Sequence, residues 1–262
     1  MDSRRTLFGA VLALGPTVFG TMLAATGVQL VVRTVVAPSV LTPSNDAAGT
    51  YLQTLGTIYA VLLAFVVFVV WTQFTETRSN LEREANALAD LVRSAGGLCA
   101  PLPERITLAG RRYADLLLGM EWKALATDDP APLEAGWSLV DELWDMLRGC
   151  EPKSETERVY YAEVLARYNE LSDARTARIA SARTRIPLPL RVLLYTGAFF
   201  TVGSMCLLGV QSAAIHCIMT ASMAGAVAHV LVVVEDLDQP FRGYWQVPSE
   251  PFERLARQLG RG

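Results

Sequence analysis

Three carboxylates near the end of the chain have the spacing that most directly suggests a binding site for a cation or a basic side chain. Glu235, Asp236 and Asp238 come directly after a long apolar segment. At the C-terminus of a helix each of these charges opposes the helix dipole, at a cost of ~0.3–1 kcal/mol, so the cluster needs a reason. A hard cation such as Ca²⁺, which takes ~6–8 oxygen ligands, is one candidate. Pairing with Arg191 or Arg242, or plain solvation, is the alternative, and three carboxylates alone do not complete a calcium shell.

The two histidines are the other titratable groups in apolar sequence. His216 and His229 lie in the same long apolar segment, the last in the chain. On a helix they are roughly 140° apart, so they do not share a face. Ionisable groups inside a membrane are functional candidates. We expect neutral imidazoles that hydrogen-bond within the protein, with contact to water as an alternative for His216.

Signatures of enzymes are missing from the sequence. It has no His-Glu-x-x-His, no phosphate-binding glycine-rich loop and no Gly-x-Ser-x-Gly. None of the four cysteines forms a Cys-x-x-Cys pair. The net charge of −3 offers no basic footprint for nucleic acid. The sequence therefore predicts a non-enzyme with no cofactor other than the Ca²⁺ considered above.

Charged residues are segregated along the chain. Asp, Glu, Lys and Arg are absent from Thr6 to Val32, from Ala47 to Thr75 and from Val192 to Val234. A bilayer forces such segregation, because a charge at its centre costs at least ~2.5 kcal/mol. About 20 apolar residues span the membrane as a helix, and the third segment is long enough for two spans joined near Gly209 and Ser212. The predicted spans are 8–32, 51–74, 190–209 and 213–234.

The N-terminus allows two interpretations. Arg4 and Arg5 open a segment that resembles a twin-arginine export signal. Its apolar stretch is about twice the ~7–15 residues of a signal, so we expect an uncleaved first helix. Basic residues gather before the first span, between spans two and three and after span four, which puts both termini in the cytosol. The prediction is a multi-pass protein of the cell membrane, either plasma or inner.

The chain outside the spans is predicted to be helical, which makes the fold all-α. Span two continues without Pro or Gly after Gly56 until Gly96 and Gly97 end it. Further helices are expected over 103–126, 132–148 and 154–185. The predicted parts are transmembrane helices one and two (1–75), a cytosolic helical domain that continues helix two (76–189), transmembrane helices three and four (190–234) and a cytosolic tail (235–262).

Span two has two different faces. Small residues (Gly56, Ala60 and Ala64) lie on one face, and such residues let membrane helices approach closely. The bulkier face either contacts lipid or forms a hydrophobic constriction of the kind that gates ions by dewetting. The candidates for lining such a pore are Tyr59, Leu62, Val66, Val69 and Gln73.

Aromatic residues recur on the helices predicted for the cytosolic domain. Core packing explains them, and a surface that binds a partner is the alternative. They are Tyr113, Trp122, Trp137, Trp144, Tyr160, Tyr161 and Tyr168.

Several short motifs together resemble the bestrophin-like family of unknown function. They are Gly56-x-x-Tyr59 with Ala64-Phe65, Trp71, Glu84-Ala85-x-x-Leu88, Glu121-Trp122 and Leu237-Asp238-x-Pro240-Phe241-x-Gly243. The more distant resemblance to bestrophins implies homopentameric anion channels with a hydrophobic neck on span two. Calcium-gated bestrophins also have an acidic clasp after span four. This sequence lacks the aromatic neck pattern, and its acidic run is short.

The function predicted from these features is an oligomeric ion channel, conducting chloride or another small inorganic anion, with span two lining the pore. Its partners would be the lipid bilayer and further copies of the chain, five by resemblance. The alternative is a membrane-anchored interaction or sensory protein whose cytosolic helical domain binds a partner. A transporter is disfavoured, because no span carries Asp, Glu, Lys or Arg near its middle.

Overall fold

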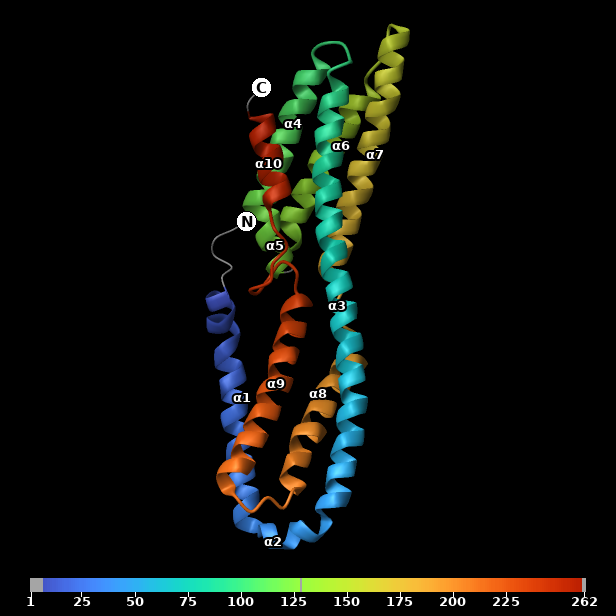
Figure 1. Cartoon of the computed structure of the whole chain (residues 1–262). Helices are drawn as coiled ribbons and strands as arrows, with labels where there is room; N and C mark the ends of the chain where they lie inside the picture. The colour runs from blue at the N-terminus through green and yellow to red at the C-terminus, as the bar shows by residue number, and fades with distance from the viewer. Residues whose placement is uncertain (1–6, 128, 261–262) are drawn as a thin grey trace. The chain divides into compact units, whose positions relative to one another are not determined.

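The computed structural model describes residues 7–127 and 129–260, and in this part of the chain every regular element is helical (Figure 1). The predicted all-α fold is confirmed. The α-helices are α1 (Leu7–Val35), α2 (Pro38–Leu41), α3 (Asn45–Ala95), α4 (Leu102–Leu116), α5 (Trp122–Thr127), α6 (Pro130–Arg148), α7 (Glu155–Arg183), α8 (Leu188–Gly203), α9 (Ala213–Leu237) and α10 (Glu250–Leu259).

The chain divides into two compact units. The first, here called the membrane unit, comprises the residues up to Thr72 together with Arg185–Asp238. The second, here called the charged unit, comprises Gln73–Thr184 and Gln239–Gly262. Helix α3 contributes its first part to the membrane unit and its remainder to the charged unit.

Apolar helices form the membrane unit, and α9 packs against both α1 and α8 (Figure 1). Four helices in the described chain are long and apolar enough to cross a membrane, as predicted. Large hydrophobic side chains on the surface of this unit, such as Phe19, Leu23 and Phe199, are more than 60% exposed. Such an exterior is unfavourable in water and suits lipid.

Two loops at one end of the membrane unit are joined by hydrogen bonds. Gly209 donates its backbone N–H to Asn45 Oδ1 at 2.7 Å, and the Arg33 guanidinium donates to the Val210 carbonyl at 2.7 Å. A side chain on Gly209 would collide with the backbone of Thr42, so the close approach of these loops requires glycine. Ser212 then caps α9, as expected for the predicted turn.

Helix α3 is 51 residues long, so the predicted extension of span two beyond the apolar segment is confirmed. Helix α8 is shorter than the predicted span, because Ser204–Leu207 tightens into a 3₁₀ turn before the loop. The motif around Arg4 and Arg5 lies outside the described residues.

The charged unit packs α4 against α6 and α10. The segment after α9, expected to be a tail, contributes to the core of this unit. Phe241 is 4% exposed in a cluster with Leu125, Leu133 and Ala182, and its ring meets Trp122 edge to face at 5.2 Å. The sequence interpretation missed the role of this segment.

The helix predicted over 103–126 contains an interruption. A π turn at Leu117–Glu121 separates α4 from α5. The extra residue in a π turn changes the direction of the side chains that follow it. Such turns are frequent at functional sites. Here the turn ends at Glu121, which is 1% exposed. The predicted helix starting at Ser154 forms as expected, with the Ser154 hydroxyl accepting from Glu157 N–H at 3.1 Å.

Candidate functional site

The predicted pore face of α3 turns toward the protein's own side chains. Tyr59 is 4% exposed, donates its hydroxyl to the Leu194 carbonyl at 3.1 Å and packs over Gly197. Val66 is fully buried. The other three members of this face, Leu62, Val69 and Gln73, are half-buried. A side chain that its own chain covers does not face an opening, so in this conformation Tyr59 and Val66 are packing residues.

The opposite face of α3 in the membrane unit is uncovered. Thr57, Val61, Ala64 and Phe68 recur every three to four residues and are all exposed, with Val61 and Phe68 each at 67%. These positions form one stripe along the helix. The small-residue face seen in the sequence shares Ala64 with this stripe, and a Cβ placed on Gly56 would meet nothing within 4 Å. The structure thus leaves this side of α3 free for water, lipid or another copy.

Glu235 and Asp238, at the end of span four, both pair with Arg191. Asp238 is 3% exposed, accepts the Ile186 backbone N–H at 2.8 Å and binds Arg191 at 2.7 Å. Glu235 lies 3.3 Å from Arg191 Nε and accepts the Tyr195 hydroxyl at 3.0 Å. The expectation that Arg191 partners these carboxylates is confirmed.

The cation alternative for Glu235, Asp236 and Asp238 gains no support from this geometry. In the described chain no group of three or more His, Cys, Asp or Glu side chains is placed to hold a metal ion. Asp238 uses one carboxylate oxygen on the Ile186 backbone and the other on Arg191, which makes it a link between α9 and the start of α8.

His216 is buried in the membrane unit, at 2% exposure, and so is shielded from water. Its Nε2 lies 2.8 Å from the Met205 carbonyl, which can only accept, so Nε2 carries the proton. Nδ1 then accepts from the Gln29 amide at 3.0 Å. His216 is therefore hydrogen-bonded within the protein, as expected from the sequence. His229 lies on the exposed surface of α9.

A buried ionic network in the charged unit was not predicted. Glu84 on α3 and Glu121 in the π turn meet Arg175 and Arg178 on α7, and all four side chains are 0–1% exposed. Arg178 lies 2.5 Å from Glu84 and 2.7 Å from Glu121, and Arg175 lies 2.6 Å from Glu121. Tyr113 donates its hydroxyl to Glu84 and accepts from Arg175 at 2.9 Å.

Charge balance makes this network viable, because two carboxylates face two guanidinium groups. Burial lowers the pKa of Arg178, but Glu84, Tyr113 and Glu121 together outweigh that effect, and the net pKa lies above the ordinary arginine value. Arg175 also stacks on the Trp137 ring at 5.0 Å. The four charges tie α3 and α7 to the π turn, which gives Glu84 and Glu121 in the sequence motifs a structural role.

Sequence reasoning named Glu84 and Glu121, which the motifs contain, and missed both arginines. Arg175 and Arg178 stand three apart in a helix rich in charges, and nothing local distinguishes them from solvated residues. The aromatic residues noted in this region differ in burial. Tyr113 is 1% exposed, whereas Trp144 and Tyr160 are 41% and 43% exposed. Trp144 stacks on Tyr168 with ring centroids 5.3 Å apart. Core packing thus accounts for only part of this set.

Fold and composition define a class, that of all-α multi-pass membrane proteins with four spans. The model of the Bestrophin-like domain matches residues 19–252, which is most of the sequence. The chain belongs to the Bestrophin-like family. No curated protein matches the sequence.

Solved structures of a bacterial bestrophin homologue from Klebsiella pneumoniae share this fold. One is 15% identical, covers 91% of this chain and 96% of its own, and has a TM-score of 0.68. A point variant of that homologue is 16% identical, covers 94% and 97%, and has a TM-score of 0.71. At this identity the likeness speaks for the fold alone.

Proposed function

We propose that copies of this chain assemble into an ion channel that conducts small inorganic anions such as chloride. Membership of the Bestrophin-like family, together with the uncovered stripe on α3, carries the proposal. The family resemblance supplies the anion preference and a ring of five copies. Both termini and the charged unit face the cytosol in this proposal, following the distribution of basic residues.

The pore face in this proposal is the stripe of Thr57, Val61, Ala64 and Phe68, in place of the face predicted from the sequence. If α3 lines a conduit, the lining must come from side chains that the rest of the chain leaves uncovered. The side chains of these four residues are uncovered. Val61 and Phe68 are bulky and apolar. They are suited to a hydrophobic constriction that excludes ions until it widens and wets.

Assembly would use Gly56 and Ala60, the part of the small-residue face that lies beside this stripe. Gly56 has open space around the position of a Cβ, so no part of the chain itself needs a glycine there. Small residues on an open helix face allow another helix to approach closely. Gly56→Leu should therefore leave the single chain intact and reduce the subunit number measured by mass in nanodiscs. Gly27→Leu, at an equally open glycine on α1, is the control.

Cysteine accessibility tests the pore face directly. In a background with the four native cysteines replaced, Val61→Cys should react with a charged, membrane-impermeant thiosulfonate, and the reaction should block flux. Leu23→Cys on α1 is the matched control, because Leu23 is also strongly exposed, at 74%. A thiol that faces lipid stays unmodified, since the reagent needs water and a thiolate.

Equal labelling rates at Val61 and Leu23 would contradict the pore face. A monomer in nanodiscs would contradict assembly. A monomer would also favour the alternative of a membrane-anchored protein whose charged unit binds a partner, because four spans in one copy leave little room for a conduit.

A further inference from the structure

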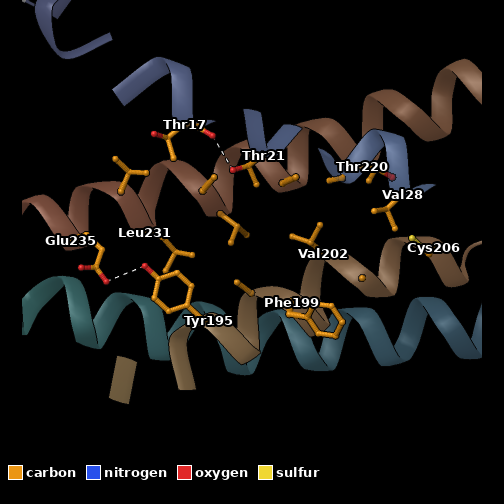
Figure 2. Close-up of a pocket in the computed structure, with 17 residues that line it drawn as sticks. Thr17, Thr21, Val28, Tyr195, Phe199, Val202, Cys206, Thr220, Leu231 and Glu235 are labelled. Atoms are coloured by element: carbon orange, nitrogen blue, oxygen red, sulfur yellow. Dashed lines mark hydrogen bonds between the residues drawn. The ribbon is translucent and has the colours of Figure 1, made fainter. Parts of the chain in front are cut away.

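A groove in the membrane unit runs between α1 and α8 over α9 (Figure 2). Its volume is about 580 Å³, within the ~300–1,000 Å³ typical of ligand sites. Apolar side chains such as Val28, Val202 and Leu231 line most of its length. One end differs, because Tyr195 and Glu235 meet there through a hydrogen bond of 3.0 Å.

We propose that this groove binds the acyl chain of a phospholipid whose ammonium headgroup is held by Glu235. The proposal concerns a site that is separate from the proposed conduit, and it does not depend on ion conduction.

The dimensions of the groove favour a hydrocarbon chain over a protein helix. Thr220 and Glu235 mark its extent along α9, and fifteen residues of helix measure about 22 Å. Its 580 Å³ extends over that length, so the groove is long and narrow. A flexible hydrocarbon chain can lie along such a groove, whereas a helix is about 10–12 Å across with its side chains and needs a wider one.

The charged end of the groove favours an ammonium group. Glu235 and Asp238 both contact Arg191 there, and together with the neighbouring Asp236 and Arg185 these groups sum to one negative charge. Both contacts to Glu235, from Tyr195 and from Arg191, are made to Oε1. No described residue bonds to Oε2, and the Glu235 side chain is 31% exposed. An ethanolamine headgroup could place its ammonium on Oε2 and its phosphate near the Arg191 guanidinium.

Gly203 offers a way to fill the groove without disturbing the helices. It lines the groove, has φ −62° and ψ −31°, and a Cβ built there meets nothing within 4 Å. Gly203→Leu would therefore add a side chain to empty space in a backbone conformation that any residue adopts. Gly27→Leu is again the matched control, since Gly27 lies outside the groove lining.

Native mass spectrometry of the intact assembly tests the proposal, with palmitoyl-oleoyl phosphatidylethanolamine and phosphatidylglycerol as probes. The wild-type protein should retain at least about fivefold more phosphatidylethanolamine than phosphatidylglycerol, a difference of about 1 kcal/mol. Gly203→Leu should lose retention of both lipids, whereas Gly27→Leu keeps it. Glu235→Gln should retain both lipids equally, because the amide no longer attracts the ammonium.

Three results would overturn the proposal. The first is equal retention of the two lipids by the wild-type protein. The second is unchanged retention in Gly203→Leu at the wild-type subunit number. The third is a reduced subunit number in Gly203→Leu with unchanged lipid per subunit, because that would place a neighbouring copy in the groove. Glu235→Gln keeps the headgroup claim testable even if Gly203→Leu fails to fold.

Discussion

Removing Glu84 from the buried ionic network should destabilise the charged unit strongly. Its carboxylate makes two contacts with Arg178, at 2.5 and 3.1 Å, and accepts from Tyr113. Glu84→Met fills a similar volume but leaves Arg178 buried with only Glu121 to balance two guanidinium groups. Breaking a buried pair in this way costs ~3–5 kcal/mol.

The matched control lies two residues earlier on the same helix. Glu82 pairs with Arg78 at 3.1 Å, but both side chains are about half exposed. An exposed pair of this kind contributes ~0–1 kcal/mol. Glu82→Met should therefore change stability by a small fraction of the effect of Glu84→Met.

Thermal unfolding in detergent, followed by tryptophan fluorescence, provides the assay. Trp122, Trp137 and Trp144 all lie in the charged unit. A loss of ~3–5 kcal/mol lowers the melting temperature of a unit this size by about 10–20 °C. The double variant Glu84→Met/Arg178→Met removes one charge of each sign, so it should lose less than the sum of the two single variants. Equal melting temperatures for Glu84→Met and Glu82→Met would refute the reasoning.

Three further changes test other contacts. Burial, with the help of Glu84, holds the pKa of Tyr113 far above the ordinary 10.0, so the folded protein keeps the phenol protonated when the unfolded chain would ionise it. This stabilisation is complete below about pH 10 and is lost as the pH rises further. Between about pH 8 and about pH 11, the melting temperature of the wild-type protein should therefore fall more steeply than that of Tyr113→Phe. Gly197→Ala places a Cβ 2.5 Å from the Tyr59 ring and should cost ~1–3 kcal/mol by denaturant unfolding, whereas the same cost at the open Gly27 would contradict this contact. Asp238→Ala leaves the Ile186 N–H unpaired and should cost ~1–3 kcal/mol more than Asp238→Asn, and equal stability of the two variants would show that the Ile186 bond is unimportant.

The spans were predictable because lipid rejects charge regardless of the fold. The four membrane helices follow from segments that lack Asp, Glu, Lys and Arg, and their ends follow from local capping and turn residues. Ser154 and Ser212 each cap a helix as their types suggest. These features depend on a few neighbouring residues or on the bilayer, so the sequence contains the information.

The orientation of α3 was not predictable from its own residues. Both of its faces are apolar within the span, so helical periodicity cannot say which one packs inside. The contact of Tyr59 with Leu194 and Gly197 decides the matter, and those residues lie far along the chain. The buried arginines were hidden for the same reason, because the carboxylate partners of Arg175 and Arg178 lie more than 50 positions away.

Ion flux tests the central claim, that copies of this chain form a channel, most directly. The wild-type protein, reconstituted at a subunit number established by mass, should release chloride from loaded liposomes faster than protein-free vesicles. Replacing Val61 or Phe68 on the exposed stripe of α3 should change that rate. Folded, oligomeric protein that leaves the liposomes as tight as protein-free vesicles would contradict the claim.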